Sequence, residues 1–539
     1  MRALLTLLCA LLALPVLGVL AAWFGFDAGS AATLRHQAST VLTGYVVQTA
    51  VLAAGVALGT TLLGAATAAA VTLFDFPGRR SFEWALLLPL AMPAYVLAYA
   101  WTDALQPSGS LQHALQAWAG AGRPLLPDVR SLWGAVILFV LCLYPYVYLL
   151  TRTALAERGV QMMEAARLLG AGMRRRVLEV ALPLARPALA AGVALALMET
   201  LADYGVGSYF GLATFTTGIY KAWLVMFDRD AAAQLASLLL LLVALLLWVE
   251  QRAQKRLRFA ATRAGAMHAA EARAIELRGG RAALAVAACA LPVLLGFVLP
   301  VAVLLRLVWL EAANAEFGLP LARFAQWAWT SFKLAGIAAL LATAAALALG
   351  FALRLRESGA LRAAARVVSL GYAVPGAVIA VGILLPVGWL QARFPQAGTT
   401  ALVTGTLFGL MYAYLVRFSA VALQSVEAGY ARVPPSVDET ARMLGASRRR
   451  LFTELHAPLL RRAGLAALLL VFVDVMKELP ATLVLRPFNS DTLAVVAYQL
   501  ARDERLGEAA LPSLAIVVVG LLPVLLLSRS LRAERLPSA

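Results

Sequence analysis

Long apolar stretches separated by short polar segments run through this chain of 539 residues. An α-helix of about 19 or more apolar residues crosses roughly 30 Å of hydrocarbon. Ten windows of that length contain no Asp, Glu, Lys or Arg, namely 3–26, 37–74, 84–102, 131–151, 231–249, 282–305, 334–353, 367–392, 394–416 and 509–528. Two further apolar stretches, near 187–205 and 463–485, carry acidic residues. The pattern predicts about twelve membrane spans.

The pattern argues against an additional span at 104–122 and against a membrane β-barrel. The segment 104–122 also lacks charge, but its Gln, Ser, His and Pro content predicts a loop. Strands of a membrane barrel alternate apolar and polar residues over about ten positions, and the runs here do not alternate. The expected fold class is therefore an all-α membrane protein.

Composition agrees with this class. Hydrophobic residues make up 62% of the chain and charged residues 14%, with a mean hydropathy of +0.81, values that a soluble domain does not reach. The three cysteines all fall inside predicted spans, so the sequence suggests neither a disulfide nor a cysteine metal site.

The net charge of +17 raises the question of a nucleic-acid partner. If the amino terminus is cytoplasmic, the segments predicted to face the cytoplasm hold 33 of the 46 Lys and Arg residues. This bias is the positive-inside rule of membrane proteins, so the basic balance needs no nucleic acid. It predicts that both chain termini lie in the cytoplasm.

One polar segment of twenty residues occurs twice, 275 residues apart. "EAARLLGAGMRRRVLEVALP" occupies 164–183, the first repeated loop, and "ETARMLGASRRRLFTELHAP" occupies 439–458, the second repeated loop. They share ten identical residues of twenty. Pro93 is likewise matched by Pro375, 282 residues on. We therefore predict two parallel six-span halves, 1–250 and 282–539, joined by a polar cytoplasmic linker at 251–281.

The repeated loops predict a helix, a bend at Gly170 or Gly445, and a second amphipathic helix. Pro183 or Pro458 suits the first turn of the helix that then enters the membrane. Small residues after each glutamate let another protein approach closely. The alternative is an interfacial helix whose arginines contact anionic lipid. The duplication favours a docking device.

Acidic residues interrupt the fifth span of each half at equivalent positions. Glu199 and Asp203 lie in the first half, and Asp474 and Glu478 lie 275 residues later. The i, i+4 spacing predicts one acidic helix face, roughly 24 to 30 Å beyond the proline that begins the span. The acids are either hydrated at the outer interface, with Lys477 as a counter-ion, or they line a path for a hard cation.

The chain shows no sign of its own ATP site. No G-x-x-x-x-G-K-[ST] loop is present, and none of the four lysines follows a glycine. Four scattered histidines offer no catalytic set, and no metal ligands are identified. We expect a non-enzymatic chain that binds no cofactor itself.

The spacing Glu-x-Ala-x3-Gly, followed about a dozen residues later by Pro, resembles the EAA loop of permease subunits in bacterial binding-protein-dependent ABC importers. The resemblance implies a type I permease in the bacterial inner membrane, a periplasmic binding protein, and two cytoplasmic ATPase subunits that bind ATP and Mg and receive the loops as coupling helices. The implied coupling residues are Glu164, Ala165, Ala166, Gly170, Pro183, Glu439, Ala441, Gly445 and Pro458. Thr440 and Ala457 make the second loop less regular.

Three further stretches are similar to the fused, two-half permeases of ferric-iron importers: "DFPGRR" (75–80), "ADYGVGSYFGLATFTTGIYKAW" (202–223) and "MKELPATLVLRPF" (476–488). This resemblance implies iron transport. Fused permeases for thiamine, and related permeases for phosphonates and other small solutes, share the architecture and stay open. A twelve-span secondary transporter with parallel repeats is the alternative from another class, but it needs no paired docking loops.

Overall fold

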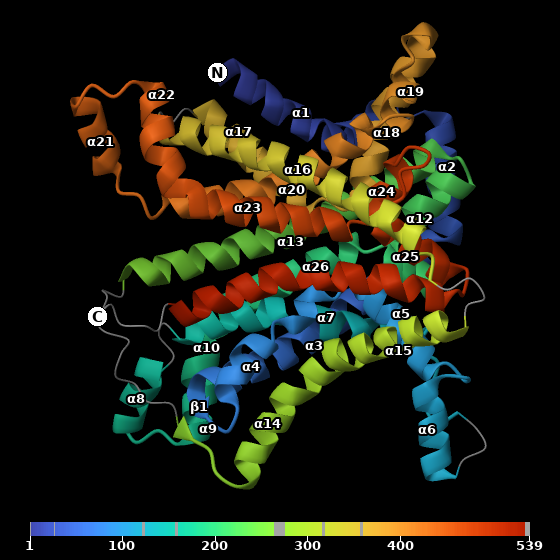
Figure 1. Ribbon diagram of the computed structural model, residues 1–539. Helices are drawn as coiled ribbons and strands as arrows, with labels where there is room; N and C mark the ends of the chain where they lie inside the picture. The colour runs from blue at the N-terminus through green and yellow to red at the C-terminus, as the bar shows by residue number, and fades with distance from the viewer. Residues whose placement is uncertain are drawn as a thin grey trace. The chain divides into compact units, whose positions relative to one another are not determined.

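The computed structural model describes residues 2–25, 27–120, 124–156, 160–263, 275–314, 319–355 and 359–533 (Figure 1). The regular secondary structure in these ranges is helical apart from two short strands, β1 (Phe74–Asp75) and β2 (Ile275–Glu276). The helices up to the linker are α1 (Arg2–Ala21), η1 (Ala22–Gly25), α2 (Ala28–Thr40), α3 (Leu42–Leu73), α4 (Arg79–Ala85), η2 (Leu88–Ala91), α5 (Ala94–Leu105), α6 (Ser110–Ala119), α7 (Leu132–Ala154), α8 (Val160–Leu168), α9 (Met173–Arg175), η4 (Arg176–Ala181), α10 (Leu182–Ala202), α11 (Gly205–Tyr209), α12 (Phe215–Tyr220), η5 (Lys221–Val225) and α13 (Arg229–Arg263).

The helices after the linker are α14 (Gly280–Val293), η6 (Leu294–Val298), α15 (Leu299–Asn314), α16 (Leu321–Leu355), α17 (Gly359–Leu370), η7 (Gly371–Ala373), α18 (Gly376–Arg393), η8 (Pro395–Ala397), α19 (Thr399–Thr404), α20 (Leu407–Tyr430), α21 (Pro435–Met443), α22 (Arg448–Arg450), η9 (Leu451–His456), α23 (Ala457–Lys477), α24 (Pro480–Leu485), α25 (Leu493–Arg502) and α26 (Leu506–Ala533). The all-α fold class is confirmed.

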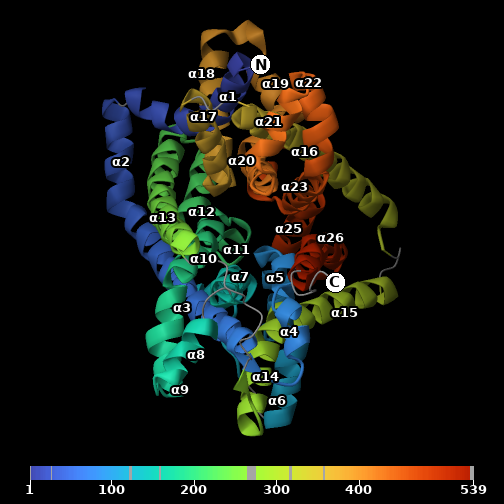
Figure 2. The same ribbon diagram turned by 90° about the vertical axis from the view of Figure 1, so that its left-hand side faces the viewer.

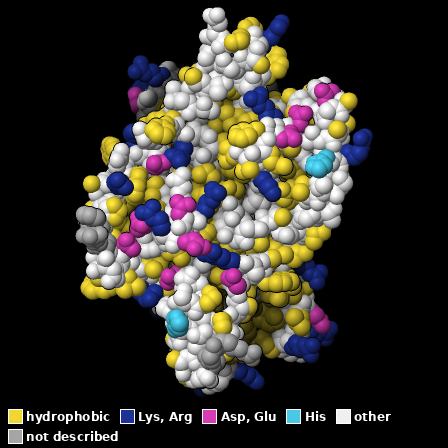
Figure 3. Space-filling model, turned by 90° about the vertical axis from the view of Figure 1, so that its right-hand side faces the viewer, with side chains coloured by type: hydrophobic (Ala, Val, Ile, Leu, Met, Phe, Trp, Pro, Cys, Tyr) yellow, Lys and Arg dark blue, Asp and Glu magenta, His cyan; other side chains and the backbone are white. Residues whose placement is uncertain are grey.

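Nine helical runs in the described residues are long and apolar enough to cross a membrane, and two bent pairs raise the number to eleven. The prediction of about twelve is slightly higher because it includes α23. That helix has 21 residues but carries Arg461 and Arg462 near its start and Asp474 and Lys477 at its end. The face seen in Figure 3 is largely apolar or uncharged, with charged side chains gathered in a few groups.

Two predicted segments are corrected by the structure. The expected loop at 104–122 contains the helix α6, because Gly109 and Gly120 bound a ten-residue amphipathic stretch whose Gln112 side chain is buried and donates to the Leu126 carbonyl. The expected span 394–416 is not one helix. It divides into η8, α19 and the start of α20, because the Thr406 side chain accepts a bond from the Phe408 N–H and begins a new helix there.

The chain forms two compact units, and each combines segments of both sequence halves. The first unit contains Met1–Thr40, Gly218–Leu240 and Pro320–Val496. The second unit contains Val41–Thr217, Leu241–Leu319 and Ala497–Ala539. The first helix of each half thus belongs to the unit built mainly from the other half: α1 packs on α17 and α18, and α15 packs on α5 and α26. The halves 1–250 and 282–539 remain a prediction about the repeat.

Small residues allow the helices within a unit to approach closely. In the first unit, α1 crosses α18 at Gly18 and Gly382. A Cβ atom on Gly382 would lie 2.0 Å from the carbonyl oxygen of Pro15, so no larger residue fits there. The exchanged position of α1 therefore depends on these two glycines.

Part of the predicted linker has a fixed place in the second unit. β2 pairs in parallel with β1, and the Leu277 N–H donates to the Asp75 carbonyl at 2.9 Å. Residues 264–274 of the linker lie outside the described residues. The end of the linker is thus held beside the end of α3.

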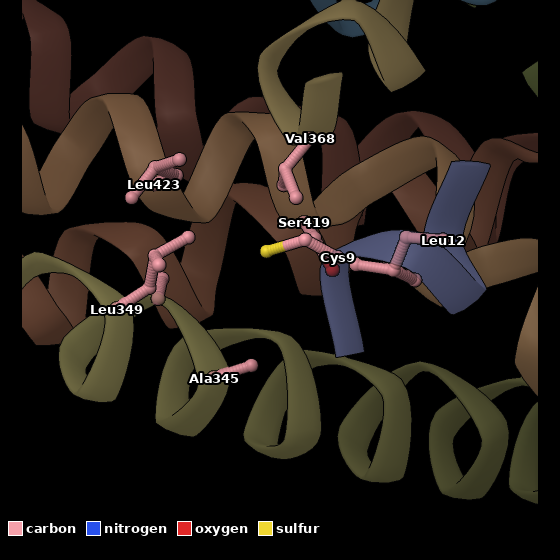
Figure 4. Close-up of a pocket in the computed structure, with 8 residues that line it drawn as sticks. Cys9, Leu12, Ala345, Leu349, Val368, Ser419 and Leu423 are labelled. Atoms are coloured by element: carbon pink, nitrogen blue, oxygen red, sulfur yellow. The ribbon is translucent and has the colours of Figure 1, made fainter. Parts of the chain in front are cut away.

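An apolar pocket lies in the first unit between α1, α16, α17 and α20 (Figure 4). Cys9 and Ser419 are its only polar lining residues, and its other walls are Ala, Val and Leu side chains. The pocket therefore has no charged lining residue and one hydroxyl group, that of Ser419.

Candidate functional site

The first repeated loop, in the second unit, is a helix that ends in a glycine turn. Gly170 adopts φ +82°, a conformation that glycine reaches without steric cost. The Gly170 N–H donates to the Arg167 carbonyl at 2.9 Å, and the Ala171 N–H donates to the Ala166 carbonyl at 2.9 Å. This pair of bonds is the Schellman motif, which ends α8 and turns the chain back toward α9.

The second repeated loop, in the first unit, has the same bonds at equivalent residues. Gly445 adopts φ +81°, its N–H donates to the Arg442 carbonyl at 3.0 Å, and the Ala446 N–H donates to the Ala441 carbonyl at 3.0 Å. α21 and α22 form a bent arm at the beginning of α23 in both views (Figure 1, Figure 2). The predicted helix and glycine bend are therefore present in both copies.

The spacing from glycine to proline that the two copies share also has a structural cause. Pro183 lacks the N–H that would bond the Glu179 carbonyl in an α-helix, and Pro458 stands in the same relation to Glu454. In each copy the helix widens to a π-helix just before the proline, over η4 or η9, and this widening absorbs the missing bond. The amphipathic helix then runs on into α10 or α23 without a break.

The tips of both loops present apolar side chains to the outside of their units. The most exposed are Leu168 (89%), Leu169 (87%), Met443 (89%) and Leu444 (81%). Glu164 and Glu439 are exposed on the same short helices, and Ala166 and Ala441 are partly exposed. Two neighbouring apolar side chains beside a carboxylate form a surface suited to a protein partner. The sequence analysis did not single out these tip residues.

Beneath the loops the two copies differ. Met163 in α8 is buried in an apolar cluster with Leu155, Ala181 and Leu189. The equivalent of Met163 in the second copy is Asp438, which is buried on α21. The sequence analysis did not identify these anchoring residues either, because Met163 and Asp438 lie one residue before the repeated segments.

Asp438 is held by two basic groups. The Arg354 Nε lies 2.7 Å from Asp438 Oδ2, and Arg354 Nη2 donates to the Val433 carbonyl at 2.8 Å. The His456 Nε2 lies 3.3 Å from Asp438 Oδ1. Burial lowers the pKa of His456, although the neighbouring Asp438 carboxylate opposes this shift. The second loop is thus anchored by the Arg354–Asp438 ion pair, with the buried His456 side chain beside it.

The acidic pairs do not form the predicted i, i+4 helix faces. Glu199 lies on α10 and Asp474 on α23, but Asp203 and Glu478 follow the ends of these helices in extended backbone conformation. The reason is that each second acid caps the next short helix. Asp203 Oδ1 accepts from the Val206 N–H at 2.8 Å, at the start of α11.

Glu478 makes the equivalent cap with more partners. Its carboxylate accepts from the Ala481 N–H, the Thr482 N–H and the Thr482 hydroxyl, at 3.0, 3.0 and 2.6 Å. Arg417 Nη1 lies 3.2 Å from Glu478 Oε1. Glu478 is buried, and Arg417 balances its negative charge within the first unit. Lys477 is the local counter-ion of Asp474 instead, at 3.6 Å.

No group of three or more His, Cys, Asp or Glu residues placed to hold a metal ion occurs among the residues that the structure describes. The two units instead each present a helical loop with an exposed apolar tip and an apolar membrane-spanning core. These features are those of a multi-pass membrane protein that carries two equivalent exposed loops.

The chain belongs to the family described as binding-protein-dependent transport system inner membrane component, whose model matches residues 60–259 and 346–533. It is 24% identical over 479 residues to the Fe(3+)-transport system permease protein FbpB 2 of Haemophilus influenzae, covering 88% of this chain and 87% of that protein. It is 23% identical over 520 residues to the probable ABC transporter permease protein y4fN of Sinorhizobium fredii, covering 90% and 87%.

A shorter match is found with the molybdenum transport system permease protein ModB of Escherichia coli, 31% identical over 130 residues, covering 24% of this chain and 55% of that protein. The family and the apolar helices together identify a multi-pass inner-membrane permease of an ABC importer. In such importers the permease is a transport subunit, ATP is hydrolysed by other subunits, and a periplasmic binding protein delivers the solute.

Proposed function

We propose that this permease moves ferric iron, delivered by a periplasmic binding protein, into the cytoplasm. The observation that carries the proposal is similarity along nearly the whole of both chains to a relative named as an Fe(3+) permease. The relative named for molybdenum transport matches only 24% of the chain.

Each repeated loop receives one ATPase subunit, so that two copies assemble on one permease, with both chain termini on the same cytoplasmic side. ATP and Mg are bound by those subunits, and this chain binds no cofactor. The matching glycine turns and exposed tips of the two loops support this arrangement, because two equivalent surfaces suit two copies of one partner.

The tips give a direct test of docking. Replacing Leu169 and Leu444 with Asp puts charge on two exposed apolar positions, where the fold itself changes by about 0.5 kcal/mol or less. We expect the double variant to reach the membrane in normal amounts but to lose the ATPase subunit on pull-down and to lose uptake. Trp118→Asp is the matched control, since Trp118 is similarly exposed, at 87%, but lies on α6, outside both loops.

A second test uses charge. Reversing Glu164 and Glu439 to Arg places like charges against a basic partner, which disfavours docking by a few kcal/mol. Uptake per inserted permease and retained ATPase subunit should both fall. If the loops instead lie on lipid, the added arginines bind anionic headgroups and transport stays nearly normal, which would refute docking.

The cargo is tested in proteoliposomes that contain permease, ATPase and the purified binding protein. We expect uptake of ferric iron that requires ATP and does not follow a proton gradient. Uptake of thiamine, molybdate or 2-aminoethylphosphonate in place of iron would overturn the iron assignment. Uptake driven by a proton gradient alone would indicate a secondary transporter. The outer segments near 206–230 and 486–508 are the expected contacts of the binding protein.

The acids on the fifth spans belong to the proposed path. Glu199 and Asp474 are partly buried side chains on α10 and α23, and carboxylates in a membrane usually line a pathway. Replacing both with their amides should reduce uptake while leaving the ATPase and the binding protein associated. Unchanged uptake would remove these two acids from the path.

A further inference from the structure

Each unit contains a helix that begins after a proline and a short helix capped by an acid. In the second unit α5 begins after Pro93 and packs on α11, which Asp203 caps. In the first unit α18 begins after Pro375 and packs on α24, which Glu478 caps. We call α5, α11 and Tyr498 the first broken-helix site, and α18, α24 and Tyr220 the second broken-helix site.

The backbones of these sites match, but their side chains do not. Pro93 and Pro375 have nearly the same conformation, with φ −60° and ψ 142° against φ −58° and ψ 141°. Four tyrosines of the first site correspond to aliphatic residues at the equivalent sequence positions of the second site. The pairs are Tyr95 and Ala377, Tyr99 and Val381, Tyr204 and Leu479, and Tyr209 and Val484. The same backbone forms without phenol groups, so the fold does not require the tyrosines.

The phenol groups of the first site lie together. The rings of Tyr204 and Tyr498 are 5.7 Å apart and their hydroxyl oxygens 3.4 Å apart. The Ser208 hydroxyl lies 2.7 Å from the Tyr498 hydroxyl, and Tyr99 packs edge-on against Tyr209 at 4.9 Å. The hydroxyl oxygens of Tyr204, Ser208 and Tyr498 therefore lie close together at α11.

The hydroxyl of Tyr99 is the strongest sign of a ligand. Its side chain is 1% exposed, and the hydroxyl has no hydrogen-bond partner among the residues described. A buried hydroxyl without a partner is costly, and a valine at the equivalent position of the second site avoids that cost. Tyr99 packs against Tyr209 at the same site, and it interacts electrostatically with Tyr498 and Asp203. A bound group that contacts these oxygens accounts for its presence.

The charge of the two sites also differs. In the second site Arg417 neutralises Glu478. The position equivalent to Arg417 in the first half is Cys142, which carries no basic group. Arg130, near Tyr209, is itself paired with Glu504 at 3.4 Å. A carboxylate among phenol oxygens repels an oxyanion and attracts a hard cation, which prefers oxygen ligands.

We propose that the first broken-helix site transiently binds the transported hard metal cation, with Asp203 and the hydroxyls of Tyr99, Tyr204 and Tyr498 as its ligands. Each phenol that binds as phenolate releases one proton to solvent. The inference rests on the proposed function, because it takes the cargo to be ferric iron. It makes the path asymmetric: one half supplies the ligands, and the other repeats the same backbone with aliphatic side chains.

The test uses Tb³⁺, a hard trivalent ion whose luminescence is sensitised by nearby tyrosine. The purified permease–ATPase complex is titrated with Tb³⁺ while tyrosine is excited. We expect saturable emission from the parent protein, and a loss of at least ten-fold in Tb³⁺ affinity in each of Tyr99→Phe, Tyr204→Phe and Tyr498→Phe.

Two controls separate this role from a structural one. Tyr220→Phe removes a phenol hydroxyl from the second broken-helix site, where it donates to the Pro480 carbonyl, and should leave Tb³⁺ affinity unchanged. Tyr99→Phe removes a hydroxyl that makes no hydrogen bond within the described part of the chain, so a purely structural role predicts equal or higher thermal stability and unchanged affinity. Unchanged affinity in the three site variants, or an equal loss in Tyr220→Phe, would overturn the proposal.

The iron assignment can fail separately. If the parent complex imports ferric iron but the site variants bind Tb³⁺ normally and transport at the parent rate, the site is wrong and the function stands. If the parent complex imports only an organic solute or an oxyanion, the function is wrong. In that case the parent protein could still bind Tb³⁺ saturably and the site variants could still lose that binding. Such a result would show a cation site that takes no part in transport, and the proposal would fail together with the proposed function.

Discussion

Met163 beneath the first repeated loop and Asp438 beneath the second stand at equivalent positions, yet they hold their loops by different chemistry. Ala181 and His456 are a second such pair. The first loop rests on an apolar cluster, and the second rests on an ion pair to Arg354. Apolar contact has no preferred direction, whereas an ion pair at 2.7 Å fixes the angle between its partners. We expect the second loop to be the more precisely oriented of two otherwise equal docking arms.

The largest effect should follow from breaking the ion pair. Asp438→Ala leaves Arg354 largely buried without its carboxylate, and losing one partner of a buried pair costs about 3–5 kcal/mol. Amide hydrogen exchange of α21 should accelerate a hundred-fold or more, with α8 unchanged as the internal control. Normal exchange in α21 would show that the ion pair does not anchor the loop.

A smaller effect is expected on the apolar side. Met163→Ala removes a buried side chain and leaves a cavity, at a cost of about 2–3 kcal/mol. Exchange of α8 should rise, and that of α21 should not. If Met163→Ala loosens its loop more than Asp438→Ala loosens the other, the contrast between the anchors is wrong.

Acidification should affect only the second loop. Because burial lowers the pKa of His456, a loop that has opened and exposed His456 to water binds a proton more readily than the packed loop does. The contribution of neutral His456 to the stability of the packed loop is therefore complete above the ordinary histidine pKa of about 6.5 and declines as pH falls below it. Exchange of α21, corrected for the intrinsic pH effect, should rise between pH 7.5 and pH 5.5. His456→Gln should abolish this dependence, and a pH response of α8 would contradict it.

The smallest effect concerns an interaction that both loops share. Arg175 pairs with Glu179 and Arg450 with Glu454, each at 2.7 Å on an exposed helix surface. Exposed pairs of this kind contribute little. Arg175→Ala and Arg450→Ala should change neither loop's exchange beyond measurement error. A clear loss of protection in one loop alone would reveal a further asymmetry.

The local structure of the loops could be predicted, because it depends on neighbours in the chain. Gly170 and Gly445 turn the backbone, and Pro183 and Pro458 remove a helical N–H, whatever surrounds them. The acidic pairs show the opposite case. Their i, i+4 spacing favoured one helix face, but the second acid bonds to N–H groups three residues ahead and ends the helix. Capping competes with helix continuation, and spacing alone does not decide between them.

The membrane class, the duplication and the bend in each repeated loop could be predicted from the amino-acid sequence, because hydropathy, periodicity and backbone preference are properties of short segments. Three features depend instead on the packing of distant segments: the composition of each unit, the contact of α1 with the other half, and the ion pair of Arg354 with Asp438, 84 residues away. It also brought Tyr204 within contact of Tyr498, 294 residues on. Such pairings depend on how helices cross, and crossing is set by small residues and side-chain shape at the contact rather than by any pattern along one helix.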